Sequence, residues 1–165
     1  MVDFHITNEL SNPQIADVTD LLRKPRLWIP TEKDYPSHRD WLDKSEAQLA
    51  SGSKRAMTAY MGSKAIGTVI YQRDPQSPSN LEIRNISVSP DARGRYVGAF
   101  LLRNAEVEAV QHDFPGVERI SVDTKATNVE MINFLLSQGY EIEDIKDLYG
   151  VGTGLDAVVS KSVTK

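Results

Sequence analysis

The fold is decided by the stretch Ser89-Pro90-Asp91-Ala92-Arg93-Gly94-Arg95-Tyr96-Val97-Gly98-Ala99, a polar, basic turn between a strand-like and a helix-like segment. A helix that begins in such a turn presents free backbone N–H groups and the positive end of its dipole, and both bind phosphate. Gly94 and Gly98 allow a ligand to approach the main chain closely, and Arg93 and Arg95 add positive charge. Taken alone, the turn is equally compatible with a helix start flanked by solvated arginines.

The segments on either side of this turn favour an anion site. Before the turn, apolar residues alternate with polar ones. Leu81 and Ile83 occupy odd-numbered positions, whereas Ile86 and Val88 occupy even-numbered positions, so the parity of the apolar positions changes between them. A β-bulge leaves such a change of parity in a strand. After the turn, residues 97–111 carry apolar side chains at a four-residue spacing, which predicts an amphipathic helix.

The remaining segments predict further strands and helices around this unit. Strands are expected at 4–7, 55–61, 65–72, 120–123, 140–145 and 155–161, and helices at 12–24, 37–51 and 128–138. The order is β-α-α-β-β-β-α-β-α-β-β, an α/β (α+β) fold with a mixed central sheet flanked by helices and a bulged fourth strand. Because no repeat or linker interrupts the chain, residues 1–165 are expected to form a single domain.

Composition excludes several classes of function. The 165 residues include no cysteine, so disulfides, thiolate metal sites and acyl-cysteine intermediates are ruled out. A net charge of −4 argues against general binding to nucleic acid or to anionic membranes. Residues 1–10 lack the uninterrupted apolar run of a signal peptide, so a cytoplasmic location is expected. The three histidines are scattered, which supports neither a metal site nor a serine-histidine triad.

Two blocks resemble the GNAT family of N-acetyltransferases. Arg93 and Gly98 occupy the first and last positions of its Gln/Arg-x-x-Gly-x-Gly/Ala motif, although Tyr96 stands where the first glycine is usual. Residues 128–140 are similar to the family's late helix, Asn-x-x-Ala-x-x-Leu-Tyr-x-x-x-Gly-Phe, with Asn128 and Gly139 at matching positions. The motifs cover about residues 81–149, and the expected element order agrees with the family fold.

The resemblance implies that acetyl-CoA is the cosubstrate and that no metal is required. Main-chain amides from Gly94 to Ala99 would bind its pyrophosphate, and the bulged strand would hydrogen-bond its pantetheine arm. Asn128 would contact the cofactor, although an asparagine there can equally serve as the N-cap of the following helix. The implied cofactor-binding residues are Ile86, Ser87, Val88, Arg93, Gly94, Arg95, Val97, Gly98, Ala99 and Asn128.

The implied reaction is acetyl transfer to a primary amine by direct attack in a ternary complex. Glu82 resembles in its placement the catalytic glutamate of histone-modifying members and is the candidate base. It can also be a solvated strand residue, and a neighbouring Arg84 would disfavour it as a base. Leu135 replaces the tyrosine that many members use as general acid, which leaves Tyr149 as the candidate proton donor or, alternatively, a packing tyrosine.

The acceptor is left open among a protein N-terminus or lysine, a polyamine, an aminoglycoside and an amino acid. In this family the early helices usually set specificity, here residues 24–49 with Trp28, Tyr35, His38 and Trp41, which can also be core or dimer contacts. Asp123 and Lys125 are further candidate acceptor contacts.

Oligomeric state and function have alternatives. A homodimer is one, since dimers are common among relatives. Because Tyr96 and Leu135 depart from the family pattern, the alternative function is a catalytically weak acyl-CoA-binding module or sensor. A nucleotide-binding domain of another class lacks the G-x-G-x-x-G spacing.

Overall fold

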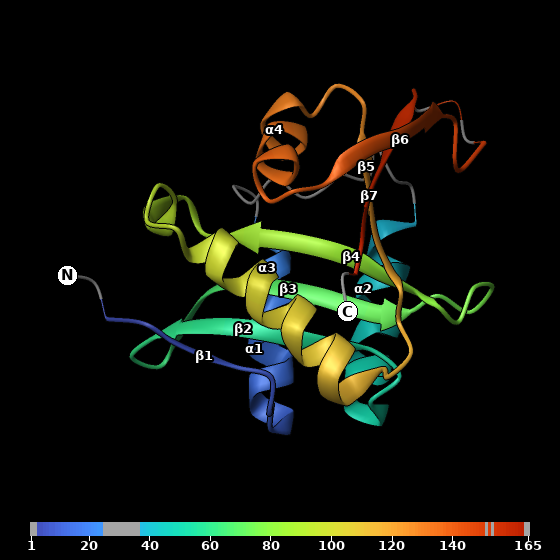
Figure 1. Ribbon diagram of the computed structural model, residues 1–165. Coiled ribbons are helices and arrows are strands. Elements are labelled where there is room, and N and C mark those ends of the chain that lie inside the picture. The colour runs from blue at the N-terminus through green and yellow to red at the C-terminus, as the bar shows by residue number, and fades with distance from the viewer. Residues whose placement is uncertain (1–2, 25–36, 151, 153, 164–165) are drawn as a thin grey trace.

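A computed structural model describes residues 3–24, 37–150, 152 and 154–163 (Figure 1). The elements follow the order predicted from the sequence. The strands are β1 (His5–Thr7), β2 (Arg55–Met61), β3 (Lys64–Arg73), β4 (Asn80–Val88), β5 (Arg119–Lys125), β6 (Glu141–Lys146) and β7 (Asp156–Ser162). The helices are α1 (Asn12–Leu22), α2 (His38–Ser51), α3 (Val97–Glu108) and α4 (Val129–Ser137). A short 3-10 turn, Pro90–Ala92, precedes α3.

The strands form one mixed sheet in the order β1-β2-β3-β4-β5-β7-β6. All neighbours are antiparallel except β4 and β5, which are parallel. Helix α3 covers one face of the sheet, and α1 and α2 cover the other (Figure 1). None of the described helices has the length and apolar character needed to cross a membrane.

Each face of the sheet has its own hydrophobic core. The α3 face buries side chains such as Leu81, Ile83 and Leu101. The opposite face packs Ile70 against apolar side chains of α1 and α2. The apolar stripe predicted for α1 is buried as expected, comprising Ile15, Val18, Leu21 and Leu22.

Two helix predictions need correction. The expected helix 97–111 is α-helical only to Glu108, after which Ala109–Asp113 forms a wider π-type turn. This turn places Asp113 against the core, where its carboxylate accepts a hydrogen bond from the Tyr71 hydroxyl at 2.8 Å. In α4, Leu135 is fully buried, but the adjacent Leu136, also expected to face inward, is 41% exposed. Consecutive helical residues point about 100° apart, so the two leucines cannot both face the core.

The predicted bulge in β4 is confirmed and lies at Arg84. Tyr71 of β3 pairs with Ile83, but the adjacent Ile70 pairs with Asn85, so Arg84 is the extra residue. At the same point β4 leaves its parallel neighbour, because its pairing with β5 is limited to residues 80–83 against 119–122. We call the opening between residues 84–88 of β4 and residues 123–125 of β5 the fork. The sequence thus places this bulge where the sheet divides.

Candidate functional site

Residues 84–88 of β4 form one wall of the fork, and residues 123–125 of β5 form the other. The β4 wall has a free backbone edge. Residues 85–88 pair with β3 along one edge, and no described strand pairs with the other. Ile86 and Val88 pack half-buried on the α3 face, whereas Ser87 is buried on the opposite face and donates a hydrogen bond to Asn85 Oδ1 at 2.8 Å. An unpaired strand edge can hydrogen-bond an extended ligand as a further strand would.

The turn at the tip of β4 exposes main-chain amides. Gly94 and Tyr96 both have positive φ, +70° and +62°, and this conformation directs the chain into α3. The helix has no side-chain cap, so the amides of its first turn, from Val97 to Ala99, have no partner within the helix. The Arg93 guanidinium braces the turn because its Nε donates to the Val88 carbonyl oxygen at 3.0 Å. These are the features of the anion site that the sequence predicts, and anion binding here stays a prediction.

Tyr96 resolves the departure from the family motif. It adopts the left-handed backbone conformation that a glycine would favour, and its side chain is 77% exposed. The ring therefore points into solvent while the main chain follows the course that the motif requires.

Gly98 faces the fork. A Cβ added there would lie 3.6 Å from Val88 and 3.6 Å from the Phe134 ring, which are ordinary contacts. The packing of the protein therefore tolerates a side chain at this position. The space left by the glycine remains open to a ligand that lies against the start of α3.

Asn128 is the N-cap of α4. Its Oδ1 accepts a hydrogen bond from the Met131 amide at 3.2 Å, and its Nδ2 donates to Thr124 Oγ1 at 3.1 Å. The side chain is buried. The capping interpretation is confirmed, and a cofactor contact from Asn128 stays a prediction.

Glu82 lies on the sheet face covered by α2, opposite to its apolar neighbours in β4. Its Oε2 accepts a hydrogen bond from Gln72 Nε2 at 2.8 Å and lies 3.8 Å from the Arg84 guanidinium. The neighbouring arginine expected from the sequence is therefore present. Both side chains are 25% exposed, so Glu82 is neither fully solvated nor sequestered.

Lys54 belongs to the same cluster, although no sequence motif pointed to it. Its buried ammonium group donates to Ser45 Oγ of α2 at 2.9 Å and lies 4.8 Å from the centre of the Trp41 ring. Burial, followed by the positive charge of Arg84, lowers the pKa of Lys54 to about 8, while Glu82 acts in the opposite direction. The cluster joins the end of α2 to β4, so only the folded chain brings its members together.

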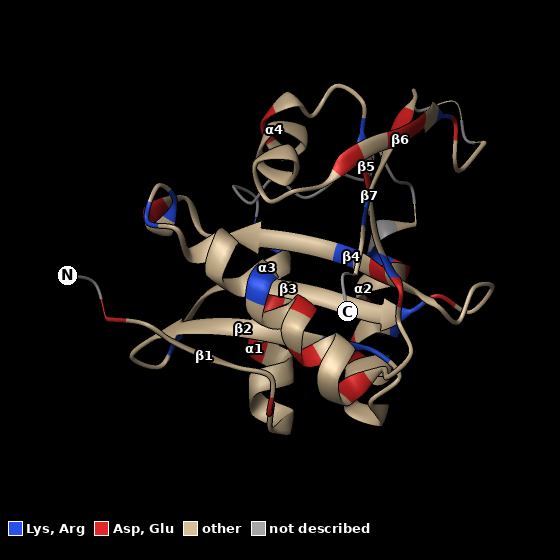
Figure 2. Cartoon of the chain, in the orientation of Figure 1, with Lys and Arg blue, Asp and Glu red and all other residues tan. Residues whose placement is uncertain are grey.

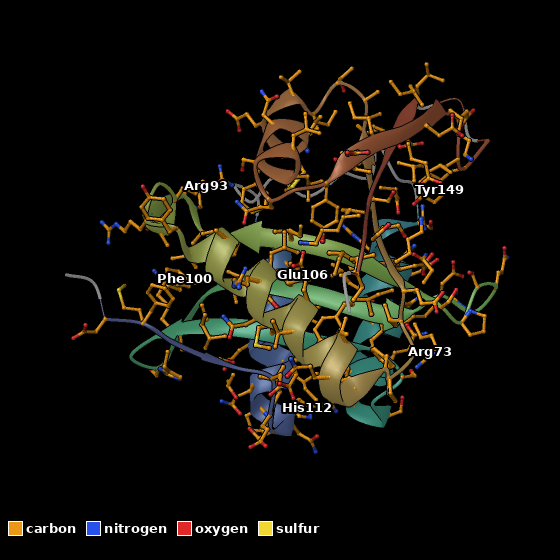
Figure 3. All side chains as sticks on the ribbon, in the orientation of Figure 1. Arg73, Arg93, Phe100, Glu106, His112 and Tyr149 are labelled. Carbon is orange, nitrogen blue, oxygen red and sulfur yellow. The ribbon has the colours of Figure 1, made fainter. Side chains whose placement is uncertain are left out.

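The β5 wall of the fork carries Tyr149. This residue, labelled in Figure 3, follows β6. Its hydroxyl donates a hydrogen bond to the Asp123 carboxylate. Next along the same face, Lys125 forms a buried ion pair with Asp156 at 2.9 Å, and its ammonium lies 6.0 Å from the Tyr149 ring. Tyr149 is 40% exposed, which is compatible both with a proton donor and with the alternative of a partly buried packing tyrosine.

Glu82 and Tyr149, the two predicted catalytic residues, lie on the same side of the sheet. Glu82 pairs with Ser121, and Asp123 is the next residue of β5 on that face. Trp28 and Tyr35, expected near the acceptor, lie outside the described residues, as does the His38 side chain. Trp41 is half-buried against Lys54.

A cavity of about 440 Å³ lies on the other side of the same turn. It is lined by Phe4, Met61, Lys64, Ile66, Ser89, Asp91, Ala92, Arg95 and Val97. Arg95, expected to contact the cofactor, thus lines this cavity beside the β2–β3 hairpin. Among the described residues, no cluster of histidine or carboxylate side chains could hold a metal ion.

Charge is distributed unevenly over these elements. Figure 2 shows basic residues in the turn before α3, whereas acidic residues gather along the later turns of α3 and along β6. The basic turn lies at the helix N-terminus, where the helix dipole adds to its positive potential. The net negative charge of the chain therefore does not oppose anion binding at this site.

Comparisons with known proteins agree with this geometry. A family model described as the acetyltransferase (GNAT) family matches residues 15–140. A search of curated protein sequences finds no significant match. Among solved structures, a GNAT-family protein from Desulfovibrio desulfuricans superposes with a TM-score of 0.79 at 12% identity, covering 98% of this chain and 100% of the other.

Two further solved structures contain coenzyme A. The PaiA N-acetyltransferase from Thermoplasma acidophilum has a TM-score of 0.73 at 17% identity, with 98% and 99% of the chains covered. An aminoglycoside 6'-N-acetyltransferase has a TM-score of 0.73 at 14% identity, with 98% of each chain covered. At these identities the structures share the fold, and the family model covers most of the chain. The chain belongs to the GNAT family of acetyltransferases.

Proposed function

We propose that this protein transfers the acetyl group of acetyl-CoA to a primary amine, by direct attack in a ternary complex. The observation that carries the proposal is the uncapped N-terminus of α3 at the open end of the fork. Its amides from Gly94 to Ala99 suit a pyrophosphate, and the free edge of Ile86, Ser87 and Val88 suits the amide groups of the pantetheine arm. Arg93 supplies charge beside the turn.

The cosubstrate provides an activated acetyl thioester, and the amine nitrogen bonds to its carbonyl carbon as the carbon–sulfur bond breaks. One proton must leave the ammonium form of the acceptor, and one must reach the departing thiolate. Glu82 is proposed to accept the first proton, directly or through water. Tyr149 is proposed to supply the second and to regain its proton from solvent, on which its side chain opens.

Acetyl-CoA binding is tested first by thermal unfolding. At a hundred times the dissociation constant, a ligand stabilises the fold by about 2.7 kcal/mol, or roughly 5–10 °C for a chain of this size. An unchanged midpoint at saturating acetyl-CoA would remove the basis of the proposal.

Turnover is tested by free-thiol release from acetyl-CoA in the presence of amines. Glu82→Gln keeps the shape of the side chain and its contact with Gln72, and is expected to lower kcat about 100-fold, the usual contribution of a general base. Tyr149→Phe is expected to lower kcat about 10-fold or more. If both variants retain native kcat, neither residue transfers a proton in the reaction.

One observation favours a second candidate, a catalytically weak acyl-CoA-binding module. Leu135, at the position of the usual tyrosine acid, is fully buried, and the Tyr149 proton is already donated to Asp123. Stabilisation by acetyl-CoA without thiol release from any amine tested would support this candidate over the enzyme.

A further inference from the structure

The two walls of the fork begin with side chains of opposite charge. Arg84 is the first residue of β4 beyond its pairing with β5, and Asp123 is the first residue of β5 beyond its pairing with β4. Ile83 and Val122, the paired residues just before them, both face the α3 core. Strand alternation places Asp123 on the opposite face, and the contact of Arg84 with Glu82 places the bulged Arg84 on that face as well, on the other side of the opening.

These two side chains do not neutralise each other. Arg84 makes its ion pair with Glu82, at 3.8 Å, and Asp123 accepts a hydrogen bond from the Tyr149 hydroxyl. Within the described part of the chain, no ion pair joins Arg84 to Asp123. The Arg84 side chain is 25% exposed and Asp123 is half-buried, so both side chains keep solvent-accessible surface.

Further charged side chains lie next to Arg84 and next to Asp123. On the β4 wall, Lys54 adds a second cation, so two positive groups accompany the single carboxylate of Glu82. On the β5 wall, Lys125 forms an ion pair with Asp156 at 2.9 Å, whereas Asp123 accepts a hydrogen bond from the neutral Tyr149 hydroxyl. The β4 wall therefore presents two positive groups beside one carboxylate, and the β5 wall presents the Asp123 carboxylate.

We infer that the acceptor is a zwitterionic amine of the amino acid class, whose carboxylate is held by Arg84 and whose ammonium group is held by Asp123. The inference rests on the proposed acetyl transfer and names its substrate. Paired strands lie about 4.8 Å apart, and the ammonium and carboxylate of an α-amino acid are separated by a comparably short distance. Such a molecule spans the fork at its narrow end, beside the free edge of β4.

The same geometry disfavours other acceptors. A polyamine would bring a second cation against Arg84 and the buried Lys54, and like charges at close range repel. An amine without a carboxylate leaves the Arg84 guanidinium without an anionic group to bind. A site built around a charged hydrogen-bonding group rejects ligands that lack the group of opposite charge. Asp123 orients the nitrogen that attacks, and Glu82, on the same face, remains the proposed proton acceptor.

The test compares each of several amino acids with its own carboxamide, which keeps the amine and side chain but removes the negative charge. Binding is measured by saturation-transfer NMR in the presence of coenzyme A, and turnover by thiol release from acetyl-CoA. The expected result is tighter binding, and a kcat/KM at least 10-fold higher, for the best amino acid than for its amide. The binding measurement does not depend on turnover, so it separates failure of this inference from failure of the proposed function.

Two variants test whether Arg84 is the residue that causes the preference for the amino acid over its amide. Arg84→Gln should raise KM for the amino acid at least 10-fold and leave that for the amide unchanged, so that the preference disappears. Arg103→Gln makes the same change of charge on an exposed residue of α3, outside the fork, and should keep the preference. Equal binding of acids and amides to the native protein, binding of neither, or a preference that survives Arg84→Gln would each overturn the inference.

Discussion

The two halves of β4 differ although they belong to one continuous strand. Residues 80–83 have hydrogen-bonded neighbours on both sides and contribute Leu81 and Ile83 to the core. Residues 84–88 have a strand on one side only, and their apolar side chains are half-buried. The bulge at Arg84 therefore separates a half that is paired on both edges from a half with one free edge, which we propose as the ligand-binding half.

The largest effect should come from removing a core side chain in the paired half. Ile83→Ala takes away a side chain that is 1% exposed, and the resulting cavity should lower the free energy of unfolding by about 3 kcal/mol. For a chain of this size the unfolding midpoint should fall by roughly 10 °C. Denaturant and thermal unfolding both measure the change.

Ile86→Ala is the matched substitution in the open half. Because Ile86 is half-buried, the expected loss is about 1 kcal/mol. If the two substitutions destabilise the protein equally, the open half is packed as firmly as the paired half, and the contrast between them is wrong.

The next effect concerns ligand binding at the end of the open half. Ala99→Glu places a carboxylate in the first turn of α3, where it interacts favourably with the helix dipole and repels a phosphate. We expect coenzyme A affinity to fall at least 10-fold while the ligand-free protein becomes about 0.5 kcal/mol more stable. Calorimetric titration and thermal unfolding measure the two changes.

Ala99→Gln is the control, because it has nearly the same shape without the charge. It should change affinity much less than Ala99→Glu does. Equal losses in the two variants would mean that the side chain obstructs the site and that charge at this position is unimportant.

Most of the fold could be predicted from the sequence because local patterns determined it. The change of parity between Ile83 and Ile86 located the bulge, and glycines marked helix ends such as Gly52, which has φ +78°. The turn proposed as the anion site was equally local, since Arg93 to Gly98 are consecutive residues. Helix length was harder to predict, because the amphipathic spacing of α3 continues into the wider turn that ends at Asp113.

The charged walls of the fork could not be predicted in this way. Arg84 and Asp123 belong to strands that are distant in sequence, and their relation depends on the residue at which the strands separate. Lys54 becomes a neighbour of Glu82 only when α2 packs on the sheet. Arg84 could be predicted as the neighbour of Glu82 because the two lie two residues apart, whereas the contact of Tyr149 with Asp123 depends on the folded sheet.

Lys54 gives a smaller effect that depends on pH. Its folded pKa of about 8 lies below the ordinary 10.5, so between these values the unfolded chain binds more protons and stability rises with pH. At pH 7 the buried charge is present and costs free energy. Lys54→Met should therefore raise the free energy of unfolding at pH 7 by about 1 kcal/mol and remove the rise between pH 8 and 10.

Urea unfolding at pH 7 and pH 9.5 measures both changes. Arg84 and Glu82 face Lys54 from β4, and loss of the rise in Lys54→Met would assign it to the lysine. Lys44→Met, an exposed position on the same helix, is the control and should change stability little at either pH. A rise that persists in Lys54→Met would assign it to another group.

Tyr96 gives the smallest expected effect, at the point where the open half of β4 passes into α3. Its left-handed φ of +62° costs an L-residue roughly 1 kcal/mol, whereas glycine adopts it without strain but loses more chain entropy on folding. Tyr96→Gly should therefore raise the free energy of unfolding by about 0.5 kcal/mol, or 1–2 °C in midpoint. Tyr96→Ala removes the same exposed ring but keeps a Cβ, so it should be less stable than Tyr96→Gly. If alanine proves the more stable of the two, the turn is not held in the left-handed conformation in solution, and the amides of α3 are not oriented as an anion site requires.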